Sequence, residues 1–505
     1  MARANWARQG VAVAVLAASC ATPGPREALE PIETDRANWA AVTEGAPATP
    51  VTDNWLADLA DPVVEEVVAD ALENNFNIQA TYARVQASRN VARATRSSLL
   101  PSVSSGLNAS RSGGPIIFQG QQFGDQFQTN FDLGLSLQWE LDVWGRLTDQ
   151  TRAAYLDAAA QNLDFAAARL SLAANAARGH FNLTAAKLQR QLAERDVETG
   201  EANLNIIERR YNRGISTSLD LRLARSSLAS SQAALEGRKQ QELEASRQLE
   251  VLLGRYPSAS IEGLSSLPNP TGLSDSRPMS LGTPEELLVR RPDIVAAERR
   301  LKAAGLRVSQ ARKAFLPQLS LSASVSENAL PPQGSTVATF EDLFDFDLLS
   351  KRLVGNLTQP IFQGGRLIAN ERQAAANARA ALYDYATTAL TAWREVEDAV
   401  AAERLLALRQ EALAVAFREA AAAEDLTERR YLAGTTNIFD LINAQQRRIQ
   451  AEGQLIDAQR ARLANRVDLY LALGAPYQLK GEEQLAEART AKPLTAMGPS
   501  EGDVL

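Results

Sequence analysis

The sequence contains one cysteine and one histidine among its 505 residues. A lone cysteine excludes an intrachain disulfide and a Cys-x-x-Cys redox pair, and the two residues together are too few for a Cys/His zinc site. His180 has no partner histidine, so we expect a structural role for it and no histidine-dependent catalysis. The composition therefore disfavours an enzyme and predicts no metal site and no cofactor.

Long hydrophobic runs and an excess of positive charge are also missing. No segment approaches the roughly 18 consecutive apolar residues of a membrane-spanning helix. Lys and Arg number 53 against 60 Asp and Glu, a net charge of −7, which argues against nucleic acid as a partner. Hydrophobic residues still make up 45% of the chain, which is enough for a large core, although aromatic residues are only 6%.

The N-terminus is typical of an export signal. A basic start with Arg3 and Arg8 precedes a short apolar segment, Val11–Ala18, and residues 17–20 resemble a bacterial lipobox that ends in Cys20. We therefore expect a signal peptide at residues 1–19, a covalent lipid such as palmitate on Cys20, and an extended lead-in at residues 20–62. Ala17 stands where the lipobox usually has leucine, so an ordinary secretory signal with a chance cysteine is the alternative.

The rest of the chain is an internal duplication. Matches recur in one order at two fixed separations, 220 and 216 positions. The pairs are Gly145 and Gly365, Arg209–Tyr211 and Arg429–Tyr431, Gly214 and Gly434, Asp220 and Asp440, Gly254 and Gly474 at 220 positions, and Ile78 and Ile294, Leu100–Pro101 and Leu316–Pro317 at 216. We predict repeats at residues 63–257 and 284–477, a linker at 258–283 and a loose tail at 478–505.

Each repeat shows the same succession of patterns. A helical stretch (Val63–Leu99 or Pro284–Leu316) leads into a strand region and then into a segment without proline, which permits a very long helix. In the first repeat, heptads of large residues and alanine indicate a coiled-coil seam from Gly145 to Tyr211, about 100 Å of helix. A cytosolic coiled-coil rod is the alternative, which the export signal and the strands argue against.

The long helices are expected to end at a turn marked by Gly214 in one repeat and by Gly434 in the other. Glycine suits the left-handed position after a helix, and the Ser, Thr and Asn residues that follow supply N-caps for a returning helix. Each repeat is therefore predicted to form a long antiparallel helical hairpin with its tip at this turn.

The strand region carries a pattern suited to a membrane. From Phe131 to Val143 apolar and polar residues alternate strictly, which predicts a transmembrane β-strand with one lipid face. Its lipid-facing residues would be Phe131, Leu133, Leu135, Leu137, Trp139 and Leu141. Further strands are expected around Val103–Ala109, Leu319–Val325 and Leu353–Ile361. A soluble sandwich is the alternative. Four strands cannot close a barrel, so about twelve strands from three copies would be needed.

At this point the sequence resembles the TolC-like outer-membrane efflux proteins, in the lipoprotein branch that serves resistance–nodulation–division pumps. The resemblance rests on Arg290–Ile294, Glu140–Arg146, Gln359–Leu367 and the tip around Gly434. It implies a mixed α and β membrane protein with two transmembrane strands and one coiled-coil hairpin per repeat. The family forms a homotrimer in the outer-membrane lipid, whose 12-stranded β-barrel is continuous with a 12-helix α-barrel. Its partners are a periplasmic adaptor (membrane fusion protein) and an inner-membrane resistance–nodulation–division transporter.

The resemblance also implies a periplasmic gate. Asp440 falls on an aspartate ring, Tyr431 on a locking tyrosine, and Asn443 where a second aspartate is common. Asp440 and Asp220 have an alternative role as first-turn aspartates favoured by the helix dipole. The adaptor would contact the tips at Gly214, Asp220, Gly434 and Thr436.

The expected function is a passive exit duct for drugs or other small molecules in a tripartite efflux system. Two alternatives stay open, a duct for protein or peptide secretion and a non-channel structural envelope lipoprotein. No phosphate-binding glycine loop occurs, so a partner must supply the energy.

Overall fold

The computed structural model describes residues 39–41, 55–59, 61–268, 281–328, 340 and 349–475. The expected signal peptide, Cys20, most of the lead-in 20–62, part of the linker and the tail 478–505 lie outside these residues. No helix among the described residues is long and apolar enough to cross a membrane.

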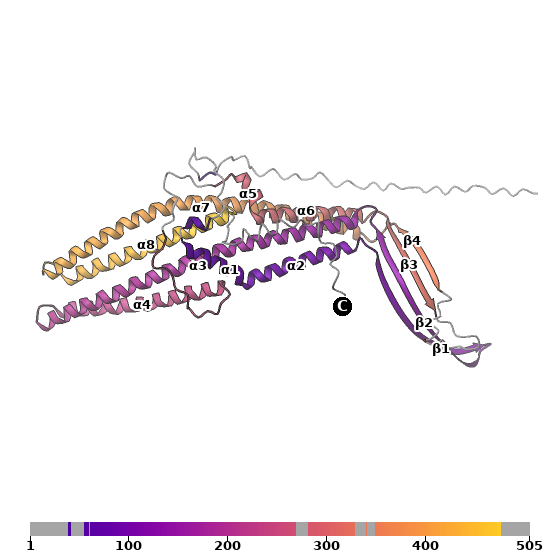
Figure 1. Ribbon diagram of the computed structural model, residues 1–505, viewed down its shortest axis with the longest axis horizontal. Helices are drawn as coiled ribbons and strands as arrows, with labels where there is room; N and C mark the ends of the chain where they lie inside the picture. Colours follow the sequence, from indigo (N-terminus) through magenta and orange to yellow (C-terminus); the bar gives the residue numbers. More distant parts are fainter. Residues whose placement is uncertain are drawn as a thin grey trace, which may run out of the picture. The chain divides into compact units, whose positions relative to one another are not determined.

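The elements follow one another along the chain as two series with the same order of helices and strands (Figure 1). The first series is η1 (Ala57–Leu59), α1 (Pro62–Asn74), α2 (Phe76–Ser97), β1 (Ser102–Phe118), β2 (Gln121–Leu141), α3 (Arg146–Asn212) and α4 (Ser218–Leu252). The second is α5 (Pro284–Arg290), α6 (Pro292–Lys313), β3 (Gln318–Asn328), β4 (Ser350–Thr358), α7 (Arg366–Leu432) and α8 (Ile438–Ala472).

Three of the four pairs of corresponding helices have equal lengths, whereas α1 has 13 residues and α5 has 7. The helices α2 and α6 each have 22 residues, α3 and α7 each have 67, and α4 and α8 each have 35. The helices α3 and α4 pack as one antiparallel hairpin and α7 and α8 as another, and α3 also packs against α2, α6 and α8. Both long hairpins predicted from the sequence are therefore present.

The long helix of the first repeat is confirmed nearly to the residue. Gly145 precedes it with a φ of 74°, and it ends at Asn212. Every residue of the predicted seam is buried or half-buried: Leu156, Ala160, Leu163, Ala167, Leu170, Ala174, Ala177, Phe181 and Leu188. At 1.5 Å per residue this helix is about 100 Å long.

The sequence predicted one continuous helical stretch at the start of each repeat. In the structure each of these stretches is interrupted. Asn75 separates α1 from α2, and its side-chain Oδ1 accepts the N–H groups of Asn77 and Ile78 at 2.9 and 3.2 Å. In the second repeat Pro292 starts α6, because it has no N–H to continue α5. Each stretch is therefore two helices, separated by a side-chain N-terminal cap in the first repeat and by a proline at the helix start in the second.

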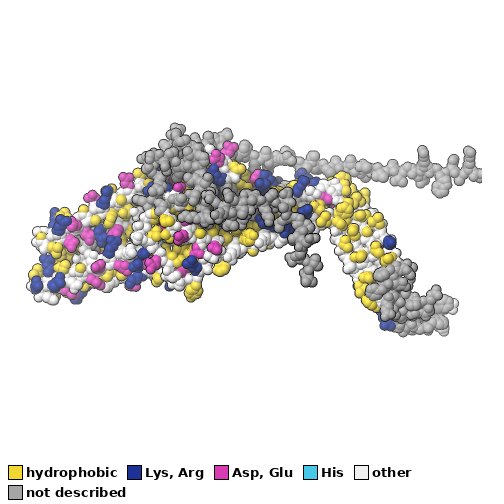
Figure 2. Space-filling model, in the orientation of Figure 1, with side chains coloured by type: hydrophobic (Ala, Val, Ile, Leu, Met, Phe, Trp, Pro, Cys, Tyr) yellow, Lys and Arg dark blue, Asp and Glu magenta, His cyan; other side chains and the backbone are white. Residues whose placement is uncertain are grey.

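The four strands form one antiparallel sheet in the order β1-β2-β3-β4. The register places Leu107 opposite Leu133, and Leu135 opposite Val325. Most apolar positions of the four strands thus share one face, with Val354 opposite Ser322 as an exception. The other face carries mostly hydroxyls and amides, such as Ser104 and Ser136 with their Oγ atoms 2.8 Å apart. Hydrophobic side chains cover much of the sheet in Figure 2, while charged ones are scattered over the helical hairpins.

The fourth strand was predicted to reach Ile361, and this end was wrong. Strand β4 stops at Thr358 because Pro360 lacks a donor for the ladder. The side chain of Gln359 instead donates from Nε2 to the carbonyl oxygen of Phe315 at 2.9 Å.

The strand-to-helix junction of the first repeat is capped by a carboxylate. Asp142 accepts the N–H of Leu147 at 2.9 Å and both the N–H and the hydroxyl of Thr148 at 2.7 and 2.6 Å. The second repeat has Phe362 at the equivalent position, so α7 starts without this cap.

The main hydrophobic core lies where α1, α3, α4, α7 and α8 meet. Trp55 stacks on Tyr470 with ring centroids 5.7 Å apart. His180 is also buried, with Nε2 at 3.1 Å from the Asp61 carboxylate that caps α1. The histidine links α3 to the start of α1, which agrees with the structural role expected from the sequence.

Candidate functional site

The tip of the first hairpin is a fully capped turn. Gly214 has a φ of 73°, and the N–H of Ile215 donates back to the carbonyl oxygen of Arg210 at 2.8 Å. Thr217 caps α4, and the Asp220 carboxylate accepts the Thr217 N–H at 2.8 Å in a reciprocal capping box. Asp220 is therefore occupied as a first-turn cap, the alternative that the sequence had left open for it.

The tip of the second hairpin has the same backbone but different side-chain contacts. Gly434 also has a φ of 73°, and Asn437 caps α8 by accepting the Asp440 N–H at 2.9 Å. The exposed Asp440 carboxylate accepts the hydroxyl of Thr436 at 2.6 Å. Asp440 therefore makes no reciprocal bond to the cap residue, and Thr436 orients its carboxylate instead.

Tyr431 lies between the two hairpins. Its side chain is only 6% exposed and packs in a cluster with Ile207, Ala224, Ile438 and Leu441. The guanidinium carbon of Arg210, on α3, lies 4.9 Å from the centre of the Tyr431 ring. A cation over an aromatic face attracts the ring quadrupole, so this contact fastens the tip of one hairpin to the other.

The sequence analysis did not single out Arg210. Nothing local in the sequence distinguishes Arg210 from its neighbour Arg209. Asn443, which was predicted to belong to the gate, lies on α8 and is half-buried.

Further polar contacts join the hairpins above the tips. Asn203 on α3 donates to the side chain of Gln445 on α8 at 2.8 Å. Arg195 on α3 pairs with Glu452 on α8 at 2.6 Å, and Glu452 also pairs with Arg448 at 2.8 Å. The two hairpins of one chain are thus linked at several levels, and a movement of α7 and α8 away from α3 must break these links.

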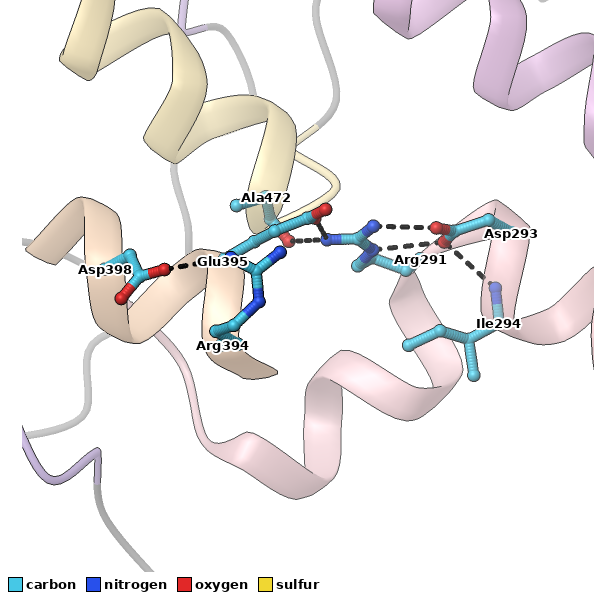
Figure 3. A network of polar contacts seen from close by, with 7 residues as sticks. All are labelled: Arg291, Asp293, Ile294, Arg394, Glu395, Asp398 and Ala472. Carbon is cyan, nitrogen blue, oxygen red and sulfur yellow. Dashed lines mark hydrogen bonds and ion pairs between the residues drawn. The ribbon is translucent and has the colours of Figure 1, made fainter. Parts of the chain in front are cut away.

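The far end of the second hairpin is held by Arg291 (Figure 3). Its guanidinium donates to Asp293 at 2.7 Å, to Glu395 of α7 at 2.7 Å and to the carbonyl oxygen of Ala472 at 3.0 Å. Burial alone would lower the pKa of Arg291, and the two carboxylates outweigh this and raise it. Arg291 therefore stays charged and ties the start of α6 to α7 and to the end of α8.

The strand residues expected to face lipid lie on the apolar face of the sheet. Leu135 is 55% exposed in the single chain, and the other five from Phe131 to Leu141 are half-buried. Among the described residues, no group of three or more Cys, His, Asp or Glu is arranged to hold a metal ion.

A comparison with protein families decides what this architecture is. The family model described as "Outer membrane efflux protein" matches residues 67–255 and 283–475. The chain belongs to the outer membrane efflux protein family.

Individual outer membrane efflux proteins are similar over nearly the full length. The pyoverdine export outer membrane protein OpmQ of Pseudomonas putida is 31% identical over 478 residues, covering 93% of this chain and 96% of that protein. The outer membrane protein OprJ of Pseudomonas aeruginosa is also 31% identical, covering 86% of this chain and 92% of that protein.

Solved structures of efflux channels have the same fold. The outer-membrane channel OprN is similar with a TM-score of 0.76 and 26% identity, covering 87% of this chain and 97% of that one. The open state of the Neisseria gonorrhoeae MtrE outer membrane channel is similar with a TM-score of 0.74 and 27% identity, covering 88% and 96%. The TolC-like fold class, the outer-membrane location and the role as an efflux channel, all predicted from the sequence, are confirmed.

Proposed function

We propose that this efflux channel is the passive exit duct of a tripartite system, closed at rest by the tips of α7 and α8. The observation that carries the proposal is the unbroken passage from strand to helix in both repeats. Strand β2 leads into α3 and β4 into α7 within a few residues, so the wall that lies in the membrane continues for about 100 Å beyond it. A channel of this kind needs no catalytic group, and an inner-membrane resistance–nodulation–division transporter would supply the energy.

The gate would be formed by the second tip. Three Asp440 carboxylates brought together around a threefold axis would repel one another and attract cations. Tyr431, buried and covered by Arg210, would hold each α7–α8 hairpin against its own α3. A periplasmic adaptor that docks on Gly214, Asp220, Gly434 and Thr436 would pull the hairpins apart.

Conductance of the purified trimer in planar bilayers tests both parts. We expect a small cation-favouring conductance in the wild type, and a loss of cation preference in Asp440→Ala. Asp220→Ala is the matched control, because its carboxylate already serves as a helix cap. Absence of conductance from inserted wild-type trimer would contradict the duct, whereas an unchanged Asp440→Ala would move the gate elsewhere.

A lipid on Cys20 is compatible with the place where the lead-in contacts α7. The N–H groups of Ala40 and Ala41 donate to the Glu397 carboxylate of α7 at 2.7 and 2.8 Å. From Glu397 to Arg366 the helix α7 rises about 47 Å toward the sheet. The 20 residues between Cys20 and Ala40 span at most about 70 Å. A lipid on Cys20 can therefore reach the membrane end of α7. Labelling with palmitate should mark the wild type and not Cys20→Ser, and an unlabelled wild type would refute the anchor.

The cargoes for which the relatives are named favour export of small molecules over secretion of proteins or peptides. OpmQ is named for pyoverdine export, and TtgF of Pseudomonas putida for a toluene efflux pump. Deletion of the gene should therefore raise the sensitivity of the cells to small toxic compounds, whereas secreted proteins should still leave the cells. The reverse result would favour the secretion alternative.

A further inference from the structure

The two repeats of one chain make matching contacts at equivalent positions. In the first repeat Nδ2 of Asn75 donates to the carbonyl oxygen of Leu252, and in the second Arg291 donates to that of Ala472. Likewise Trp139 donates to the carbonyl oxygen of Leu99 at 3.0 Å, and Gln359 donates to that of Phe315 at 2.9 Å. Positions before the strands are related by 216 residues and positions after them by 220.

A second class of contacts joins the first repeat to the second. Strand β2 pairs with β3, and helix α3 packs on α6. On these helices Arg300 of α6 forms an ion pair with Asp164 of α3, and Arg307 with Asp157. These contacts leave β1 and β4 as the edges of the sheet, and α2 and α7 as the corresponding edge helices.

When both residues of an α3–α6 contact are replaced by their equivalents in the other repeat, the contact joins α7 to α2, the two edge helices. The equivalent of Asp164 is Asp384 on α7, and the equivalent of Arg300 is Arg84 on α2. Both side chains are exposed, and neither has an ion pair or hydrogen bond to any other described residue. Opposite charges are thus kept at the two positions, although no partner in the part of the chain that the structure describes uses them.

We propose that Asp384 pairs with Arg84 of a second copy of this chain, once at each subunit interface of the ring. Charge complementarity and continuity with the α3–α6 interface both support a second copy as the occupant. The inference rests on the ring of identical subunits in the proposed duct, but not on what the duct transports.

The sheet supplies an independent register for the same interface. Leu137 on β2 lies opposite Ala323 on β3. The same replacement sets Leu357 of β4 opposite Leu107 of the next copy's β1. These two leucines are 67% and 56% exposed in the single chain, and both lie on its apolar face. Their pairing would complete the apolar surface at the seam between subunits.

Cross-linking tests the proposed pair directly. Arg84→Cys and Asp384→Cys are combined in the full-length chain, and the purified trimer is treated with a short bismaleimide. We expect dimers and trimers on a denaturing gel from the double variant and only wild-type background from each single variant. The matched control combines Arg300→Cys with Asp164→Cys, which should cross-link within one chain and run as a monomer.

Two outcomes would overturn the proposal. Monomers alone from Arg84→Cys with Asp384→Cys, in particles that retain trimer size and react with the reagent, would show that the residues do not meet. A ladder from either single variant would show that each residue meets its own copy instead. A cross-linked trimer that fails to conduct would refute the duct and leave the pair intact.

A charge exchange provides a second measurement if the cysteine variants fold poorly. Arg84→Asp and Asp384→Arg should each speed dissociation of the trimer by about fivefold, and the combination should restore the wild-type rate. If the combination is as unstable as the sum of its parts, the two residues do not interact.

Discussion

Asn75 and Arg291 occupy equivalent positions, and each donates to the last carbonyl oxygen of a corresponding helix through a different side chain. Asn75 reaches the carbonyl oxygen of Leu252 at the end of α4, and Arg291 reaches that of Ala472 at the end of α8. Only Arg291 also binds two carboxylates, on Asp293 and Glu395. The second repeat thus adds a charged link to α7 at a joint where the first repeat uses a single amide.

Replacement of Arg291 should test the strength of this joint. Arg291→Ala leaves the Ala472 carbonyl and the Glu395 carboxylate without the guanidinium, so we expect a loss of about 2–3 kcal/mol in the free energy of unfolding. Arg291→Asn should restore part of the loss by retaining an amide donor. Arg290→Ala is the control, since its pair with Glu286 is a surface contact within one helix turn. Denaturant unfolding followed by circular dichroism measures all three, and equal losses for Arg290 and Arg291 would contradict the assignment.

Glu250 should make stability depend on acid pH. It is fully buried, and burial alone would raise its pKa, but hydrogen bonds from Ser258, Ala259 and Ser260 outweigh this and lower the pKa to about 2. Its stabilising contribution is therefore complete above the ordinary value of 4.5 and is lost as the pH falls toward 2. Glu250→Gln should be less stable than the wild type at neutral pH, and the difference should vanish near pH 2.

The control for this experiment is Glu262→Gln, whose side chain is largely exposed on the segment that follows α4. It should follow the wild type closely across the pH range. A constant difference between wild type and Glu250→Gln from pH 7 to pH 2 would show that the carboxylate charge is not what stabilises this segment.

Arg210 should oppose opening of the proposed gate. Arg210→Ala removes the cation from the face of Tyr431 and should favour opening by about fivefold, because a half-buried cation–π contact is worth about 1 kcal/mol. The open fraction in planar bilayers measures the effect. Arg209→Ala, one residue earlier and exposed, should leave gating unchanged. If both variants open the channel equally, general charge at the tip is responsible.

The two faces of the sheet should respond oppositely to charge. Leu135→Lys places an ammonium on the apolar face, which costs about 2–4 kcal/mol at the middle of a bilayer. Ser136→Lys places the same group on the other face, where water would solvate it. The amount of protein recovered from the outer membrane should fall for Leu135→Lys only. Equal recovery of both variants would refute the lipid face.

The sequence predicted local features better than contacts between distant segments. The heptad seam and the glycine turns determine α3 and both tips, because these signals depend only on neighbouring residues. The break at Asn75 was missed because its carboxamide caps α2 locally while also reaching Leu252, 177 residues away. Arg210 was missed for the same reason, since its partner Tyr431 belongs to the other repeat.

The equal lengths of α3 and α7 indicate where the chain tolerates an insertion. One extra residue in α3 or α7 would turn every later side chain by about 100° and spoil its packing. The four residues by which the repeats differ lie between the proline pair Pro101 and Pro317 and the glycine pair Gly145 and Gly365, which includes the strands and their connections. The tight turn at Gln119 and Gly120 therefore offers a site for an inserted epitope, which an antibody would reach on intact cells.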